Sequence, residues 1–333
     1  MSRVSRRQVV QSVGAMGLAL LAGCGRLPLP GQQPARVPRI GWLANASRGE
    51  ELRAFRHGLG ELGYVEGQTI VIEERYNEGR MDPLPELAAE LVRLEVDVFV
   101  VGAGNPGIRA ARDATSTIPI VGLAGVDPVA AGLVASLGRP GGNVTGLAAL
   151  SKGLSQKRLE LLKEAAPAIS RVAVLWDSTV PDKAIELNEI PEAALKLGVQ
   201  IVSLEVREPE DFERVFAVGV KQQADALLVL NSGLTLTHRA RIAELATSNR
   251  LPSISEFRET TLAGGLMAYG SNRFETFRRA AYYVDRILKG AKPADLPIEQ
   301  PMTFDFVINL KTAQALGLTL PPHVLLQATE VIQ

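Results

Sequence analysis

Residue types that do chemistry are thinly scattered along this chain. The three histidines, His57, His238 and His323, are far apart, and their spacing fits neither a helix face nor a hairpin. A metal site needs clustered histidine, cysteine or carboxylate ligands, and the single cysteine, Cys24, lies near the N-terminus. The sequence contains no Gly-x-Ser-x-Gly elbow and no Walker loop. We therefore predict no metal site, no catalytic residue and no enzymatic activity.

One glycine pattern could hold a cofactor. Residues 102–107 read Gly-Ala-Gly-Asn-Pro-Gly between an apolar run and a helical pattern, and Asp127 follows about twenty residues later, as in dinucleotide-binding fingerprints. Against this interpretation, Pro106 removes one N–H donor that a pyrophosphate would use. No group of residues suited to hydride transfer accompanies the motif. We therefore predict no cofactor. An exported NAD(P)-dependent oxidoreductase that uses this motif stands as the alternative function.

The same glycines suit a binding site. A strand-to-helix loop without bulky side chains lets a carboxylate approach the free N–H groups of the helix, and ligands of open α/β sheets bind beyond the carboxyl ends of strands. Taken singly, Ser47, Asn105 or Asp127 is equally well explained as a helix cap or turn former. Six loops nevertheless combine small residues with amide, hydroxyl or carboxylate side chains: 45–47, 102–105, 125–127, 177–179, 231–233 and 255–256.

Apolar runs and amphipathic stretches alternate through the part of the chain that would position these loops. The first half predicts strands at 39–45, 69–76, 96–102 and 118–124, with helices at 49–62, 83–94 and 106–114. The second half repeats the strand pattern 128 to 133 residues later, at 171–177, 200–206, 224–231 and 251–257. Such alternation is typical of βαβ units. We predict an α/β fold with two Rossmann-like parallel-sheet lobes, the alternative being one large sheet.

Later segments are expected to connect the lobes. Residues 143–147 and 264–270 look like crossing segments, and the helix at 272–288 is expected to return to the first lobe. The strand 304–308 and the helix 310–316 then belong to the second. Several crossings make a hinge, because a few linking residues absorb the rotation of stiff lobes. The predicted division is 39–146 plus 271–300 for lobe 1, and 147–270 plus 301–333 for lobe 2.

Composition narrows the class of protein. The 333 residues are 46% hydrophobic and 22% charged, which excludes intrinsic disorder and allows two domains of ordinary size. Basic and acidic residues balance at 36 each, so we expect no nucleic-acid partner. No apolar run is long enough for a multispan membrane protein.

The N-terminus resembles an export signal. Residues 1–23 carry the pair Arg6-Arg7 before a mildly apolar stretch, similar to a twin-arginine signal peptide. Residues 21–24, Leu-Ala-Gly-Cys, resemble a bacterial lipobox, in which the thiol of Cys24 would carry the lipid. The Pro-rich stretch 24–38 would be the tether. We predict an exported lipoprotein, periplasmic or on the outer face, held to the membrane only through Cys24. A short N-terminal helix with an incidental cysteine is the alternative.

Several motifs together resemble a known family, the bacterial ABC transporter substrate-binding lipoproteins with a type I periplasmic-binding-protein fold. The most specific is Arg-Pro-Gly-Gly-Asn-Val-Thr-Gly at 139–146. The others lie at 38–43, 55–59, 114–121, 127–129, 132–137, 264–270 and 308–313. The resemblance implies a monomeric receptor that traps a small molecule, for instance an amino acid, between its lobes and delivers it to an ABC permease driven by an ATPase. A sensor without transport is a third possibility.

The resemblance also implies a set of ligand-binding residues. Asp127 or Glu256 is expected to pair with a ligand amine, and Tyr269 to line an apolar part. The Gly104–Asn105 backbone and Ser47 would hold a carboxylate. The full expected set is Asn45, Ser47, Gly104, Asn105, Asp127, Asp177, Asn231, Glu256 and Tyr269. Asn105 and the loop 231–233 depart from the family pattern, so the identity of the ligand stays open.

Overall fold

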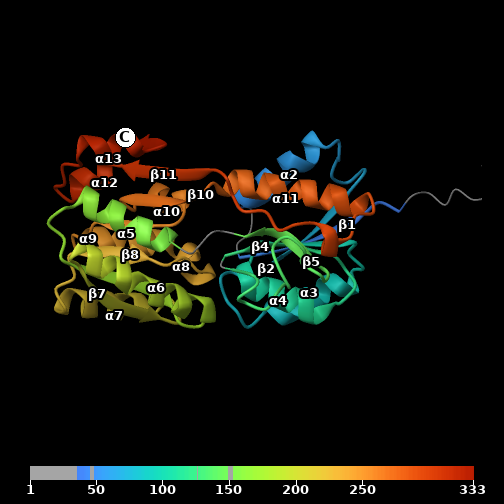
Figure 1. Cartoon of the computed structure of the whole chain (residues 1–333), viewed down its shortest axis with the longest axis horizontal. Coiled ribbons are helices and arrows are strands. Elements are labelled where there is room, and N and C mark those ends of the chain that lie inside the picture. Colours follow the sequence, from blue (N-terminus) through green and yellow to red (C-terminus); the bar gives the residue numbers. More distant parts are fainter. Residues whose placement is uncertain (1–35, 46–48, 126, 149–152) are drawn as a thin grey trace, which may run out of the picture. The chain divides into compact units, whose positions relative to one another are not determined.

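The strands form two sheets made mainly of parallel pairs (Figure 1). The structure is a computed structural model that describes residues 36–45, 49–125, 127–148 and 153–333. In the first sheet the order is β2-β1-β3-β4-β5, and all neighbours run parallel. Its strands are β1 (Arg39–Ala44), β2 (Val71–Tyr76), β3 (Val98–Val101), β4 (Ile120–Ala124) and β5 (Val144–Ala148).

Helices cover both faces of the first sheet because its strands are apolar on both sides. In β1, Ile40 and Trp42 pack into one core cluster and Leu43 packs into another. The first cluster contains residues of α2 (Glu50–Glu61) and α11 (Arg273–Leu288), and the second contains residues of α3 (Leu84–Arg93) and α4 (Gly104–Ala114). The late helix α11 packs against α2, which places it beside the first sheet.

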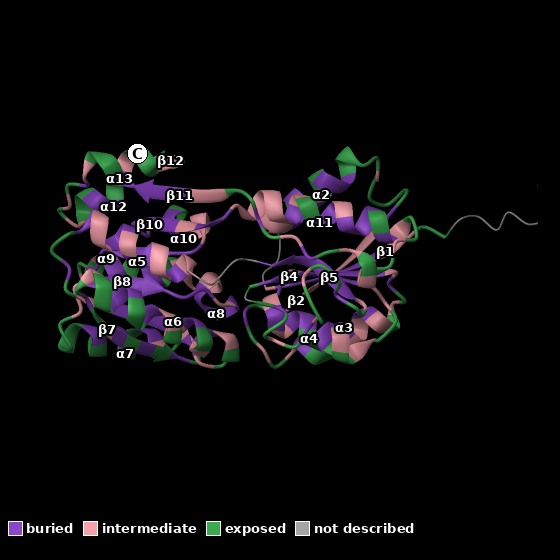
Figure 2. Cartoon of the chain, in the orientation of Figure 1, coloured by how far each residue is buried: buried purple, intermediate pink, exposed green. Residues whose placement is uncertain are grey.

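The second sheet has the order β12-β11-β10-β9-β8-β6-β7, and its interior is buried like that of the first (Figure 2). The pair β10–β11 is antiparallel and the others are parallel. The strands are β6 (Arg171–Asp177), β7 (Gln200–Val206), β8 (Ala226–Val229), β9 (Ser253–Ser255), β10 (Met267–Ser271), β11 (Phe304–Asn309) and β12 (Glu330–Ile332). Helices are α5 (Leu154–Ala165), α6 (Pro181–Leu197), α7 (Asp211–Lys221), α8 (Gly233–Thr237), α9 (Arg239–Ser248), α10 (Arg258–Leu262), α12 (Leu310–Ala315) and α13 (Pro322–Gln327). None of the helices in the described ranges is long and apolar enough to cross a membrane.

The segments expected to be crossings are themselves strands. Residues 144–148 form β5 in the first sheet, and residues 267–271 form β10 in the second. Both runs are apolar and largely buried, β5 at the edge of its sheet beside β4 and β10 between β9 and β11. The end of β5 therefore lies beyond the predicted lobe boundary at 146. The rest of the division into lobes remains a prediction. The first lobe is defined as the first sheet with its helices, and the second lobe as the second sheet with its helices.

Two chain passages between the sheets are bonded to each other. The N–H of Asn272, which follows β10, donates to the carbonyl of Thr303 just before β11 at 2.9 Å. The Asn272 side chain accepts from the N–H of Glu275 and so caps α11, while its amide donates to Asp305. A hinge is expected at these paired passages, and the start of α11 sets their position.

The aromatic core of the first lobe gives a test of this packing. Phe55 is fully buried, with its ring 5.3 Å from that of Trp42. We expect Phe55→Ala to lower the free energy of unfolding by about 3–5 kcal/mol, because it leaves a cavity between α2 and β1. The exposed Val65→Ala variant is the control and should change it by less than about 0.5 kcal/mol. Urea denaturation measures both, and equal losses would contradict the assigned core.

Candidate functional site

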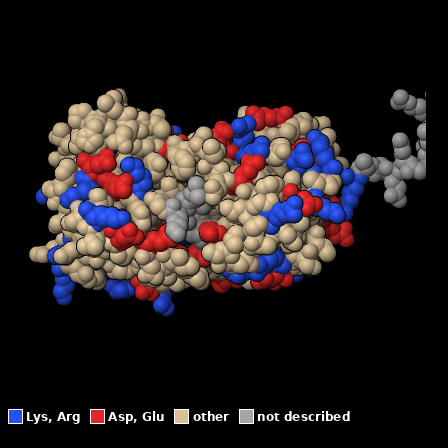
Figure 3. Space-filling view, in the orientation of Figure 1, with Lys and Arg blue, Asp and Glu red and all other residues tan. Residues whose placement is uncertain are grey.

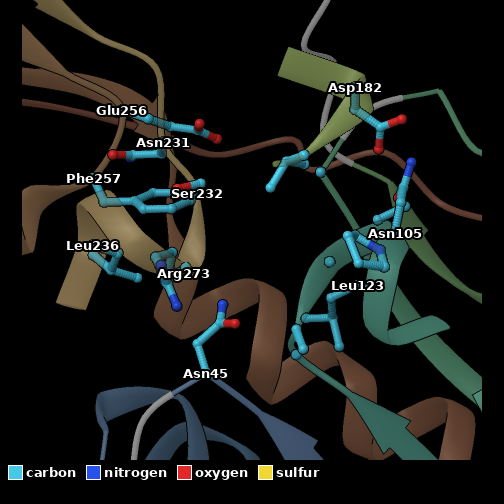
Figure 4. Close-up of a pocket in the computed structure, with 18 of the residues that line it drawn as sticks. Asn45, Asn105, Leu123, Asp182, Asn231, Ser232, Leu236, Glu256, Phe257 and Arg273 are labelled. Carbon is cyan, nitrogen blue, oxygen red and sulfur yellow. The ribbon is translucent and has the colours of Figure 1, made fainter. Parts of the chain in front are cut away.

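The carboxyl ends of strands from both sheets meet around one cavity (Figure 4). The first lobe contributes Asn45 after β1, residues 102–106 after β3 and Gly125 after β4. The second contributes residues 231–233 after β8 and residues 256–257 after β9. The space between the atoms measures about 950 Å³, part of it open to solvent. Parallel strands bring these loops together because all of their carboxyl ends lie at one edge of the sheet.

Most of the cavity wall is apolar. Leu123 and Phe277 lie on the side of the first lobe, and Leu236 and Phe257 lie on the side of the second. A cavity lined mainly by apolar side chains, with a few polar groups among them, suits a small organic molecule.

Three asparagines on opposite walls have buried polar atoms without a partner among the described residues. These atoms are Nδ2 and Oδ1 of Asn105, Nδ2 of Asn231 and Oδ1 of Asn45. Asn105 is 2% exposed and Asn231 is 6% exposed, although both line the cavity. A buried amide without a hydrogen bond costs about 1–3 kcal/mol, so a bound polar group at this place would stabilise the protein.

Helix α4 directs its N-terminus at the same space. Its N-cap residue, Ala103, has no side chain to accept a hydrogen bond, and the first turn contains no acidic residue. Gly104 has φ +63°, a left-handed conformation that favours glycine. Free N–H groups at a helix start attract a carboxylate, although Pro106 provides none.

A buried ionic network supports the second-lobe wall. Arg158 lies 3.4 Å from Glu186 and 3.5 Å from Glu256, and Lys183 lies 2.7 Å from Glu186. Ser155 donates to Glu186 at 2.5 Å. The two positive and two negative charges balance, which is the condition under which buried charges are tolerated. Lys183 and Glu256 of this network also line the cavity.

Two further charged residues of the cavity have different surroundings. Arg273 at the start of α11 forms ion pairs with Glu51 and Glu259, and its guanidinium lies 4.2 Å from the centre of the Phe257 ring. Asp182, in the first turn of α6, has no hydrogen-bond or ion-pair partner among the described residues. Asp182 is thus the carboxylate of the cavity that remains available to a positively charged ligand. Figure 4 shows it on the same side of the cavity as Asn105.

Five of the nine residues predicted from the sequence line this cavity: Asn45, Gly104, Asn105, Asn231 and Glu256. Ser47 lies outside the described residues, as does the predicted lipid acceptor Cys24. The cavity also includes residues that the sequence analysis missed, among them Asp182, Phe257 and Arg273. Asp182 and Phe257 follow predicted loops by three residues and one residue, so slightly longer loop assignments would have included them.

The other three predicted residues lie elsewhere. Asp127 is exposed, and its carboxylate accepts from the N–H groups of Val129 and Ala130 as a turn former. Asp177 is buried and its Oδ1 accepts from the N–H and hydroxyl of Thr179, so it fixes its own loop.

Tyr269 packs away from the cavity, in the core of the second lobe. Its ring is stacked on Phe304 and meets Phe306 edge-on, each at 6.1 Å. The apolar part of the site is formed by other side chains, and the sheet register explains why: Tyr269 is paired with Phe306 across the β10–β11 ladder.

The glycines at 102 and 107 serve packing of the first lobe. A Cβ on Gly102, just after β3, would stand 3.0 Å from the Phe277 ring of α11, and one on Gly107 of α4 would stand 2.9 Å from Cγ1 of Val101 in β3. Both are close approaches between helix and strand, which explains the spacing of these glycines without a dinucleotide. The described ranges also contain no group of three or more histidine, cysteine or carboxylate residues placed to hold a metal ion.

Two parallel-sheet lobes with a solute-sized cavity at the strand ends define a two-lobed binding protein. The sequence model of the family described as "ABC transporter substrate binding protein" matches residues 41–332, and the chain belongs to this family. It has the type I periplasmic-binding-protein fold. Proteins of the family are exported receptors for solutes, so the oxidoreductase alternative is not favoured.

Individual relatives add detail. The chain is 24% identical to a tyrosine-binding protein of Clostridioides difficile (strain R20291) over 316 residues, 92% of this chain and 90% of the relative. A Streptococcus pneumoniae ABC domain in complex with L-Trp is 28% identical, with a TM-score of 0.81 over 89% of this chain and 99% of the other. A ligand-free, open substrate-binding protein of Clostridium difficile is 25% identical, with a TM-score of 0.64 over the same shares.

The ionic network predicts a pH dependence of stability. Burial by itself raises the pKa of Glu186, but the charges of Lys183 and Arg158 and the hydrogen bonds from Lys183 and Ser155 outweigh it and lower the pKa to about 2. Because the folded-state pKa lies below the ordinary value of 4.5, the stabilisation is complete above pH 4.5 and is lost as the pH falls towards 2. We expect this contribution to be about 3 kcal/mol.

Glu186→Gln tests this contribution by urea denaturation between pH 3 and pH 7. The variant should be less stable than the wild type by about 3 kcal/mol at pH 7, with a difference that shrinks as the pH falls below 4.5. Glu192→Gln on the exposed face of the same helix is the control and should follow the wild-type curve. A difference that stays constant with pH would contradict the assignment.

Proposed function

We propose that the chain is the receptor for an amino acid with an aromatic side chain, bound in the cavity between the lobes. The observation that carries the proposal is the set of buried asparagine atoms without partners on both walls of a mainly apolar cavity. Such a cavity accepts a ligand with a compact polar head and an apolar body. The named specificity of the two relatives, tyrosine and L-Trp, supports this class of solute.

The lining of the cavity suggests a role for each part of the solute. The ammonium group would pair with Asp182, since Glu256 already faces Arg158. The carboxylate would accept from the Asn105 amide and the first N–H groups of α4. The ring would lie against Phe257 and the other apolar residues of the wall. This arrangement replaces Asp127 by Asp182 as the partner of the amine and keeps the predicted use of Asn105.

The purified full-length chain is first screened by thermal shift with L-tyrosine, L-tryptophan, L-phenylalanine, L-leucine, glucose and NAD. An aromatic amino acid at about 100 times its dissociation constant should stabilise the folded state by about 2.7 kcal/mol and raise the melting temperature. Stabilisation by NAD would support the oxidoreductase, and stabilisation by glucose alone would refute the amino-acid assignment.

Asp182→Asn tests the role of the free carboxylate. Loss of a charge-assisted hydrogen bond of about 1.5–3 kcal/mol should weaken binding of L-tyrosine by about 10- to 100-fold in calorimetric titrations. Glu189→Gln is the matched control, since Glu189 lies on the same helix but does not line the cavity, and its affinity should be unchanged. Equal affinities of the two variants would exclude Asp182 as the amine partner.

We also propose that the chain is a monomeric lipoprotein anchored through Cys24, which delivers its solute to an ABC permease and its ATPase. The family membership supports delivery to a permease, and the lipobox-like sequence 21–24 supports the anchor. In bacteria fed an alkyne-labelled fatty acid, the wild type should take up label and fractionate with membranes. Cys24→Ala should do neither, while an unlabelled wild type would contradict lipidation.

A further inference from the structure

Beside the cavity, two loops touch through bare backbone. Gly79 follows β2 and is buried, and Gly233 begins α8. A Cβ on Gly79 would stand 2.6 Å from the carbonyl oxygen of Gly233, and a Cβ on Gly233 would stand 2.9 Å from Cα of Gly79. Real Cβ atoms essentially never come closer than 3.0 Å to another heavy atom. In this arrangement of the lobes neither position can hold a side chain.

Gly79 lies in a tight turn with an unusual backbone conformation. The N–H of Arg80 donates to the carbonyl of Asn77 at 2.9 Å, and the two residues between them have φ +49° at Glu78 and φ +78° at Gly79. Two successive positive φ values are those of a type I′ turn. The buried Asn77 amide also donates to the carbonyl of Arg80 and so closes the turn. A non-glycine residue in the left-handed region is strained, and such strain persists where the surroundings impose it.

Polar groups surround the contact. Oδ1 of Asn45 would lie 2.8 Å from a Cβ on Gly233, and Oγ1 of Thr237 would lie 2.9 Å from a Cβ on Gly79. Both oxygens are buried and have no hydrogen-bond partner among the described residues. Asn45 comes from the first lobe and Thr237 from the second, so the glycine contact and the cavity share one wall.

We propose that Gly79 and Gly233 form the closing contact of the cleft, and that Gly79 sets the affinity for the solute without touching it. The inference rests on the proposed function, because it takes the cavity as the place where the solute is enclosed. The narrowest gap between the lobes is fixed where their backbones meet, and one added methyl group holds the walls apart. The greater similarity of this structure to the L-Trp complex than to the open, ligand-free relative supports a closed arrangement.

The chain offers a matched control for Gly79→Ala. Gly67 has φ +79°, almost the value of Gly79, but nothing lies within 4 Å of the place where its Cβ would be. Alanine introduces the same backbone strain at either position, whereas only the methyl group of alanine at 79 would clash with Gly233 in the opposite loop. A difference between the two variants therefore reports the contact and not the turn.

The affinity for L-tyrosine of the full-length variants is measured by calorimetric titration. Gly79→Ala should weaken binding at least about tenfold, since the closed state becomes rarer, and Gly67→Ala should bind like the wild type. Melting temperatures of the two unliganded variants should agree. Gly233→Ala should also weaken binding of L-tyrosine. The double variant should lose less binding free energy than the sum of the two single variants, because either methyl group alone already holds the walls apart.

Small-angle X-ray scattering adds a readout that does not depend on the solute. The radius of gyration of Gly79→Ala should exceed that of Gly67→Ala, with or without L-tyrosine. If the two variants agree in both radius and affinity, the closing contact is refuted. If the radii differ but the wild type does not bind L-tyrosine, the contact stands and the proposed solute is wrong. Equal radii together with no binding refute both.

Discussion

The parallel arrangement of strands is the constraint on which the rest of the structure depends. A parallel sheet buries both of its faces, so polar chemistry is confined to its edges and strand ends. In each lobe the strands end in short loops that carry asparagine, glycine or carboxylate residues, and these loops meet at one cavity. The apolar residues near the same ends, such as Leu123 and Phe277, are continuous with the core. Stability and binding therefore share the same strands.

In the second lobe the wall of the cavity is supported by buried charged side chains and not by apolar ones alone. Four buried charges on α5, α6 and the loop after β9 neutralise one another, and Arg158 also donates to the carbonyl of Tyr269. Replacement of such a network by apolar residues is often neutral for stability, so its presence here is better related to geometry than to stability. It joins the start of α6, with Asp182, to the loop that carries Phe257, and both contact the cavity.

The proposed closure involves two kinds of contact between the lobes: Arg273 of α11 with Glu259 and Phe257, and the pair Gly79 and Gly233. The hinge passages at Asn272 and Thr303 are bonded to each other, and the contact at Gly79 and Gly233 consists of backbone alone. A side-chain-rich interface would hold the lobes together without a solute. A contact of two glycines fixes the closed distance without locking it, so the solute-free chain still populates the closed state and a ligand that bridges the walls increases its share. On this view the asparagine amides without partners and the glycine contact both let a bound solute stabilise the closed state.

Local patterns were sufficient for most of the secondary structure. The strands β6 and β7 have the same bounds in the structure as in the sequence prediction, and the return of α11 to the first lobe followed from chain order and amphipathic spacing. The strands β5 and β10 were misjudged as crossings because short apolar runs do not reveal their neighbours. In the same way Asp127 and Asp177 have the composition of ligand contacts, but hydrogen bonds to their own loops fix their carboxylates.

What the sequence determined by itself was the α/β class, the order of strands and helices, and the loops that could carry a site, since these depend on local propensity and periodicity. Only the tertiary structure decided which loop residues share one cavity. Asp182, Phe257 and Arg273 come together from α6, the β9 loop and α11. The turn at Gly79 passed unnoticed in the sequence, because its significance lies in a contact with Gly233, more than 150 residues away along the chain. Distances of that kind are set by the packing of two sheets, which no local pattern records.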